Sequence, residues 1–269
     1  MIRQPVVAGQ FYPGSPQSLE NEVRSCLAAA PEVRDERTLL AMAPHAGYVY
    51  SGQVAGTTLG QANLGSSILM LGPNHTGMGR PFSVWPRGSW LTPLGPADID
   101  ESLAKALIAA EPRLEPDQAA HAQEHSLEVL LPFLQVKMGS VKFVPVAVSE
   151  PRLSELAAAA KSLAGVLRGW PEPVSMVVSS DMSHYVPHER AKELDSMALG
   201  AVLRLDPVGL YSTVREMGIS MCGVLPMTLG LMTALELGAA NAELAAYSTS
   251  GDASGDYGRV VGYAGVLVS

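Results

Sequence analysis

Several histidines of this sequence occupy positions from which they could form one functional site. His45, His75 and His184 each come shortly after a run of apolar residues, and His125 lies at the start of a predicted helix. Neutral imidazole binds transition metals, and imidazole also titrates near neutral pH. Because four of the six histidines occupy such matching places, we predict a metal site or a cluster for general acid–base catalysis.

The apolar runs that precede three of these histidines are predicted to be strands of one sheet. Residues 39–43, 67–71 and 174–178 are apolar runs in which Ser67 and Ser175 are the only polar residues, and such runs are typical of strands covered on both faces. Ligands of open α/β sheets bind outside the carboxyl ends of the strands. We therefore expect His45, His75 and His184 to converge at one edge of the sheet.

Helical patterns alternate with strand-like runs along the rest of the chain. This alternation predicts an α/β sandwich around a mostly parallel or mixed sheet, in one domain over residues 1–269. Helices are predicted over residues 53–62, 98–111, 124–133, 152–168 and 188–205, and further strands over residues 141–148, 245–247 and 259–267.

The charge balance excludes two classes of partner. A net charge of −8 argues against nucleic acid and against binding to an anionic membrane surface, because both need basic clusters. Residues 217–235 are uncharged but contain proline and glycines, so we expect a buried turn and helix rather than a membrane span. Only 16% of residues are charged, which indicates a large buried fraction or the interface of a homo-oligomer.

The two cysteines, Cys26 and Cys222, are too few for a disulfide framework. No export signal is recognised, so we expect a cytoplasmic protein with reduced thiols. Cys26 lies in a helical pattern and is predicted to be structural. Cys222 is either a small core residue or a third ligand beside His45 and His75; a thiolate with two imidazoles would suit zinc, copper or iron.

Two other segments allow two interpretations each. The glycine-rich loop 250–258 carries two carboxylates but lacks the spacing of a calcium loop. We favour a tight connection between two strands, with a site-lining loop as the alternative. Trp85 and Trp90 belong either to the core or to the rim of a pocket.

The ordered motifs of the chain resemble those of the Memo family, whose prokaryotic members are described as component B of the AmmeMemoRadiSam system. The resemblance runs over nearly the whole chain. It is carried by RQPVVAGQFYP at 3–13, APHAGY at 43–48, LGPNH at 71–75, EHSLE at 124–128, SSDMSHY at 179–185, MCG at 221–223 and SGD at 250–252.

This resemblance implies a single-domain α/β/α sandwich similar to the class III extradiol dioxygenases. It implies metal ligands at His45, His75 and Cys222. His125 and His184 would be the acid–base residues, and Asp181 would support them or act as an extra ligand. The dioxygenases use a carboxylate as third ligand, so a cysteine at that place argues against cleavage of catechol rings.

The expected function is therefore that of a Memo-family oxidoreductase that depends on a transition metal, with iron or copper favoured over zinc. Its substrate would be a small molecule or a peptide. The resemblance also implies a radical SAM protein and an AMMECR-type protein as pathway partners. The alternatives are a non-catalytic module that binds a peptide or a metal, and a zinc-dependent hydrolase.

Overall fold

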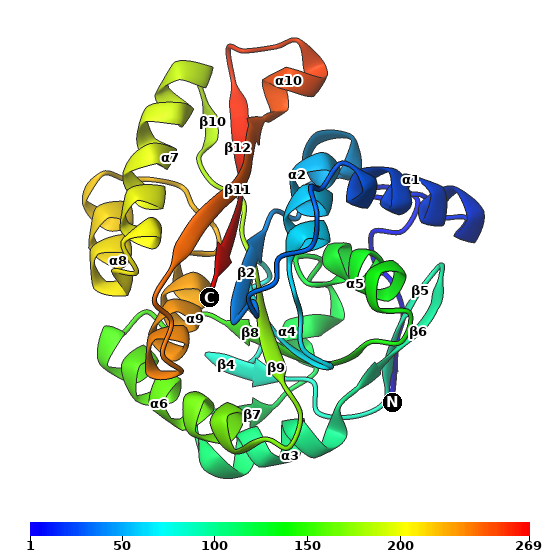
Figure 1. The fold of residues 1–269 in the computed structure, drawn as a ribbon, viewed down its shortest axis with the longest axis vertical. Helices are drawn as coiled ribbons and strands as arrows, with labels where there is room; N and C mark the ends of the chain where they lie inside the picture. Colours follow the sequence, from blue (N-terminus) through cyan, green and yellow to red (C-terminus); the bar gives the residue numbers. More distant parts are fainter.

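A central sheet lies between two layers of helices in the computed structural model, which describes residues 1–269 (Figure 1). This confirms the predicted α/β class with a mixed, mostly parallel sheet. The strands are β1 (Ile2–Arg3), β2 (Leu40–Ala43), β3 (Ser67–Pro73), β4 (Phe82–Val84), β5 (Ser89–Thr92), β6 (Gly95–Ile99), β7 (Glu115–Pro116), β8 (Lys142–Val148), β9 (Val174–Ser179), β10 (His184–Val186), β11 (Ala242–Thr249) and β12 (Val260–Val268).

The helices lie on both faces of this sheet. They are α1 (Pro16–Ala28), α2 (Tyr48–Gln61), α3 (Glu101–Ala110), α4 (Ala119–Ala122), the 3₁₀ helix η1 (Glu128–Leu130), α5 (Leu131–Met138), α6 (Leu153–Gly169), α7 (His188–Leu203), α8 (Pro207–Glu216), α9 (Val224–Glu236) and α10 (Ser250–Ser254). Helices α1, α2 and α5 cover one face, and α3, α6 and α9 cover the other (Figure 1).

The centre of the sheet is parallel, and this decides where the site lies. Strands β8, β3, β9 and β2 are neighbours in that order and run in the same direction. Their carboxyl ends therefore meet at one edge. Strand β12 pairs antiparallel with β2, and it also carries β11 and β10, which extends the sheet beside that edge.

Burial on both faces explains why the central strands read as continuous apolar runs. In β2, Leu40 and Met42 belong to one hydrophobic core, whereas Ala41 and Ala43 belong to the core on the opposite face. Successive side chains of a strand point to opposite faces. An apolar residue is therefore needed at every position rather than at every second one.

Helices α1 and α2 pack closely because glycines leave room between them. A Cβ atom on Gly56 would lie 2.5 Å from the backbone carbonyl carbon of Cys26, and one on Gly60 would lie 2.5 Å from Cβ of Ala30. The backbone of α1 cannot move away from an added methyl group as easily as the end of a flexible side chain can. Cys26 is buried in this contact, in agreement with the structural role predicted for it.

Replacing Gly56 by Ala is expected to lower the free energy of unfolding by about 1–3 kcal/mol, because the added methyl group overpacks the contact between α1 and α2. The matched control is Gly165→Ala in α6, where nothing lies within 4 Å of the added atom. That variant should be up to about 1 kcal/mol more stable than the parent. Equal stability of the two variants in urea denaturation would contradict this description of the helix contact.

The prediction of one helix over residues 124–133 was partly wrong. The chain is not helical at residues 124–127, and the helical segment begins at η1. The reason is that the carboxylate of Glu124 accepts the backbone N–H groups of Ser126 and His75, which holds this segment as a loop. The short strands β4 to β7 were not predicted, because their apolar stretches are brief and broken by proline and glycine.

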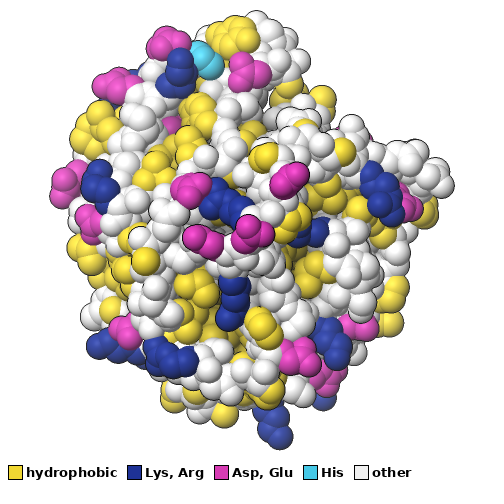
Figure 2. Space-filling view, viewed as in Figure 1, with side chains coloured by type: hydrophobic (Ala, Val, Ile, Leu, Met, Phe, Trp, Pro, Cys, Tyr) yellow, Lys and Arg dark blue, Asp and Glu magenta, His cyan; other side chains and the backbone are white.

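Residues 217–235 form the predicted turn and buried helix, the latter being α9. None of the helices combines the length and the apolar composition that a bilayer crossing requires. On the face shown in Figure 2, acidic and basic side chains are interspersed rather than gathered by sign. Trp85 and Trp90 are buried, and the guanidinium of Arg3 lies 4.2 Å from the ring centroid of Trp90, so these tryptophans belong to the core.

Candidate metal centre

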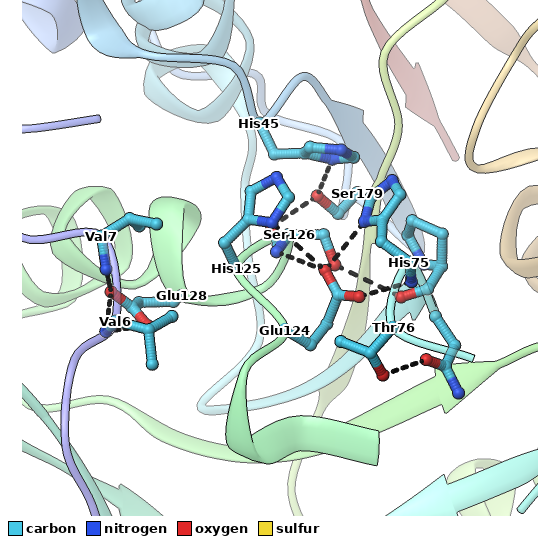
Figure 3. Close-up of polar contacts among 12 residues, drawn as sticks. Val6, Val7, His45, His75, Thr76, Glu124, His125, Ser126, Glu128 and Ser179 are labelled. Atoms are coloured by element: carbon cyan, nitrogen blue, oxygen red, sulfur yellow. Dashed lines mark hydrogen bonds and ion pairs between the residues drawn. The ribbon is translucent and has the colours of Figure 1, made fainter. Parts of the chain in front are cut away.

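The histidines that follow β2 and β3 converge as predicted. One potential ligand atom from each of His45, His75 and His125 lies within 4.8 Å of the other two. The rings of His75 and His125 are stacked with their centroids 5.1 Å apart, and the His45 ring stands edge-on to both. Figure 3 shows the three rings grouped above the carboxylate of Glu124.

His45 is buried, and its hydrogen bonds define which nitrogen is protonated. Its Nδ1 lies 2.7 Å from Oγ of Ser179, and that hydroxyl donates its proton to the carbonyl of Ser126 at 2.7 Å. The hydroxyl therefore accepts from Nδ1–H, which leaves Nε2 with a free lone pair. Burial, together with the nearby His75, holds the pKa of His45 well below its ordinary value. The ring is thus neutral, as a metal ligand must be.

His75 is oriented by a carboxylate for which no role was predicted from the sequence. Glu124 accepts the backbone N–H of His75 at 2.6 Å and its Nδ1–H at 2.9 Å, so Nε2 of His75 is free. Burial alone would lower the pKa of His75, but the hydrogen bond and charge of Glu124 outweigh it and raise that pKa. Although burial opposes it, these same contacts lower the pKa of Glu124 to about 2.

His125 is held less firmly than the other two. Its Nδ1 lies 3.7 Å from Oε1 of Glu124, which is too far for a hydrogen bond. The ring of Phe11 stands edge-on to it at a centroid distance of 5.0 Å. Burial lowers the pKa of His125, which favours the neutral ring.

Cys222 lies beside His45, with Sγ 3.5 Å from Nε2 of that ring. The backbone N–H of Asp181 donates to the sulfur at 3.2 Å. The next residue must be glycine, since a Cβ atom on Gly223 would lie 2.3 Å from Cβ of Ser180. Burial raises the pKa of the Cys222 thiol. A bound cation would offset this effect, because metal ligation deprotonates a thiol.

Asp181 and His184 follow β9 and lie at the same edge. Asp181 is buried and accepts the backbone N–H of His45 at 2.8 Å, and burial raises the pKa of its carboxyl group. His184 donates Nδ1–H to the carbonyl of Met182 at 2.8 Å, which leaves its Nε2 free. All of the predicted site residues therefore gather at one edge, with Cys222 next to His45 but outside the group of three histidines.

A pocket of about 520 Å³ opens over these groups. His45, His75, His125 and His184 are among its lining residues. Ser250, Ser254 and Asp256 also line it, so loop 250–258 contributes to the site as well as joining β11 to β12. The favoured interpretation of a simple strand connection was incomplete, because the loop folds into α10 at the mouth of the pocket.

The roles of Ser179 and Glu124, whose side chains orient the two histidines, were not predicted from the sequence. The sequence feature that could have indicated a role for Glu124 is its place directly before His125. Metal-binding histidines often donate their second ring N–H to a carboxylate, so an acidic residue beside a candidate ligand is a candidate partner. No local signal could have paired Ser179 with His45.

Comparisons with known proteins agree with the arrangement of these motifs. A sequence model described as Memo-like protein matches residues 3–267. The chain belongs to the Memo-like family. It is 38% identical over 268 residues to a MEMO1 family protein of Methanosarcina barkeri, covering 99% of this chain and 100% of the relative.

Other relatives of this Memo-like chain show similar coverage. A MEMO1 family protein of Methanopyrus kandleri is 38% identical over 279 residues, with 99% of each chain covered. One of Aquifex aeolicus is 38% identical, with 99% of this chain and 98% of the relative covered. An uncharacterized protein from Escherichia coli K12 shares the fold, with a TM-score of 0.60 and 14% identity, over 87% of this chain and 100% of that one.

Proposed function

We propose that this Memo-like protein binds one transition-metal ion through His45, His75 and Cys222 and acts as a metal-dependent oxidoreductase. The observation that carries the proposal is the placement of the donor atoms. The hydrogen bonds at Nδ1 leave Nε2 of His45 and Nε2 of His75 available as donors to a metal, and the sulfur of Cys222 lies 3.5 Å from Nε2 of His45. Ligands bound at about 2.1 and 2.3 Å in tetrahedral geometry would be separated by about 3.6 Å.

The surroundings of the two histidines support ligation. Metal-binding histidines almost always donate the other ring N–H to a carboxylate, a carbonyl or a water, which fixes the tautomer. His75 donates to Glu124, and His45 donates to the hydroxyl of Ser179. Imidazole and thiolate donors favour iron, copper or zinc over magnesium or calcium. The preference for iron or copper comes from the similarity of the motifs to an oxidoreductase scaffold.

The remaining residues are suited to proton transfer. When bound, the metal would supply a Lewis acid and a redox centre. His125 is neutral, lines the pocket and has no hydrogen bond at Nδ1, so we assign it as the base that accepts a proton from a substrate hydroxyl. His184 lines the same pocket with a free Nε2. Burial raises the pKa of Asp181 to about 6, so its carboxylate can take up and release a proton more readily than an exposed aspartate near neutral pH.

The group of three histidines favours one alternative. Three histidine ligands with an open position are typical of zinc sites that activate water, and His45, His75 and His125 form a group of suitable dimensions. In that case the protein would be a zinc-dependent hydrolase and Cys222 would be a neighbour only. A module that binds a metal or a peptide without turnover is the second alternative.

Metal analysis of protein purified without oxygen and without added metal tests these options, when it is combined with X-ray absorption at the edge of the metal found. We expect iron or copper with one sulfur neighbour at about 2.3 Å. Zinc with only nitrogen and oxygen neighbours would overturn the proposal in favour of the hydrolase. Folded protein that takes up none of these metals would favour a peptide-binding module.

Replacing Glu124 by Gln is expected to weaken metal binding by about 10- to 100-fold, because outer partners of ligating histidines contribute that much. The amide keeps the shape of the side chain but removes the charge that orients and polarises His75. Affinity is measured by competition with a chelator of known strength. The matched control is Glu172→Gln, whose carboxylate accepts from Ser66 at the opposite end of β9, and it should bind like the parent. Unchanged affinity in Glu124→Gln would contradict the role assigned to the charge of Glu124.

A further inference from the structure

Arg259 is the only lysine or arginine that lines the histidine pocket. It lies directly before β12, and its guanidinium carbon is 5.4 Å from the ring centroid of Tyr185. The side chain is exposed and makes no ion pair within the protein. A guanidinium offers a planar fork of donors that matches a carboxylate. The guanidinium group lies over the ring of Tyr185, and its N–H groups remain available to donate hydrogen bonds to a ligand.

The backbone brings Tyr185 to the pocket in an unusual way. Neighbouring residues of a strand point to opposite faces, yet His184 and Tyr185 both line the pocket. This is achieved by a left-handed backbone at Tyr185, with φ of 59°, and by a register shift between β10 and β12 at the same place. Non-glycine residues with such strained backbone gather at functional sites. Core packing does not explain it, since Tyr185 is 65% exposed.

The rest of the pocket wall is suited to a flat ring. Phe11, Tyr50 and Tyr263 line it together with Tyr185, so four aromatic side chains surround the space. Aromatic rings pack well in offset or edge-to-face contact with one another. The volume of about 520 Å³ lies in the range of pockets that hold small molecules.

The charged side chains that line the pocket favour a singly charged anion over a doubly charged one. Asp181 and Asp256 line it as well, so Arg259 is the single fixed cation in a pocket that also contains two carboxyl groups. A monoanion can be matched by one guanidinium, whereas a dianion such as a phosphate monoester would meet surplus negative charge. A carboxylate therefore fits better than a phosphate.

We propose that Arg259 and Tyr185 form a binding subsite for the carboxylate of an aromatic acid, at the mouth of the histidine pocket. The inference deepens the proposed function, since it names the substrate class of the same site. The carboxylate is bound by the fork of Arg259, and the ring lies against Tyr185. The opposite end of the ring then extends into the pocket toward the histidines.

The experiment measures binding of benzoate, benzamide and phenyl phosphate to the metal-free full-length protein, by ligand-detected NMR titration. We expect benzoate to bind more tightly than the other two probes. Arg259→Gln should weaken benzoate binding about tenfold or more, because it removes a charge-assisted hydrogen bond. Tyr185→Gly, which keeps the left-handed backbone without the ring, should weaken it several-fold. The control Arg87→Gln changes the net charge equally and should bind like the parent.

The outcomes separate this inference from the proposed function. Absence of benzoate binding, equal binding to the parent and to Arg259→Gln, or tighter binding of phenyl phosphate or benzamide would each overturn it. His75→Ala should still bind benzoate without metal, even though its metal binding is lost. If benzoate binding appears only after metal is added and survives in Arg259→Gln, the anion binds the metal and the subsite is wrong.

Discussion

Replacing His75 by Ala is expected to weaken transition-metal binding by more than about 100-fold, which exceeds the loss typical of an outer partner. His75 belongs both to the proposed ligand set and to the group of three histidines, so this result does not depend on the third ligand. The measurement is metal content after dialysis, together with chelator competition. His75 lies in a loop and is partly exposed, so the variant should fold.

His188→Ala is the matched control, because its ring is directed to Thr249 and lies outside the pocket. It should bind metal like the parent. A His75→Ala variant that keeps the parent affinity would remove the basis of the proposed function. The third ligand is decided by a second pair of variants. Cys222→Ser should lose most of the soft-metal affinity and His125→Ala should keep it; the reverse result would establish the three-histidine site.

The second large effect is expected at Glu128, whose carboxylate is completely buried beside Arg3. Glu128→Gln should lower the free energy of unfolding by about 3–5 kcal/mol, because removing one partner leaves the other charge buried and unpaired. The carboxylate accepts from Arg3 at 2.7 Å, from the Tyr12 hydroxyl at 2.7 Å, and from the backbone N–H groups of Val6 and Val7 at 2.9–3.0 Å. Figure 3 shows the two valines at this carboxylate.

The measurement for Glu128 is urea denaturation followed by circular dichroism. Glu20→Gln is the control, since the pair of Glu20 with Arg24 is exposed on α1 and should contribute at most about 1 kcal/mol. The double variant Arg3→Met/Glu128→Gln should lose less stability than the sum of the two single variants, because neither charge is then left unpaired while the amide oxygen can still accept from Tyr12, Val6 and Val7. A loss below about 1 kcal/mol in Glu128→Gln would contradict the structural role assigned to this pair.

This ion pair also bears on the site. Glu128 begins η1 directly after the loop that carries Glu124 and His125, and Arg3 donates to the carbonyl oxygens of His121 and Glu124. The N-terminal segment that contains Arg3, Val6 and Val7 therefore holds this loop through hydrogen bonds to Glu128, His121 and Glu124. We expect Glu128 to affect metal binding only through stability, since its carboxylate does not line the pocket.

Much of the fold could be predicted because its signals are local. The runs at residues 39–43, 67–71 and 174–178 became β2, β3 and β9, since strands buried on both faces need apolar residues at every position. The helix over residues 124–133 was mispredicted at its start, because one of the two hydrogen bonds by which Glu124 holds the loop comes from the distant backbone N–H of His75. No window of sequence contains both partners of such a contact.

The sequence by itself determined that strands end in histidines and that parallel strands bring these ends to one edge. Apolar pattern and chain direction are sufficient for that conclusion. Only the tertiary structure decided that Ser179 and Glu124 orient His45 and His75, that Cys222 lies beside His45, and that Arg259 meets Tyr185 at the rim. These contacts depend on side-chain directions, backbone strain and hydrogen-bond geometry between segments far apart in the chain, which neither composition nor periodicity encodes.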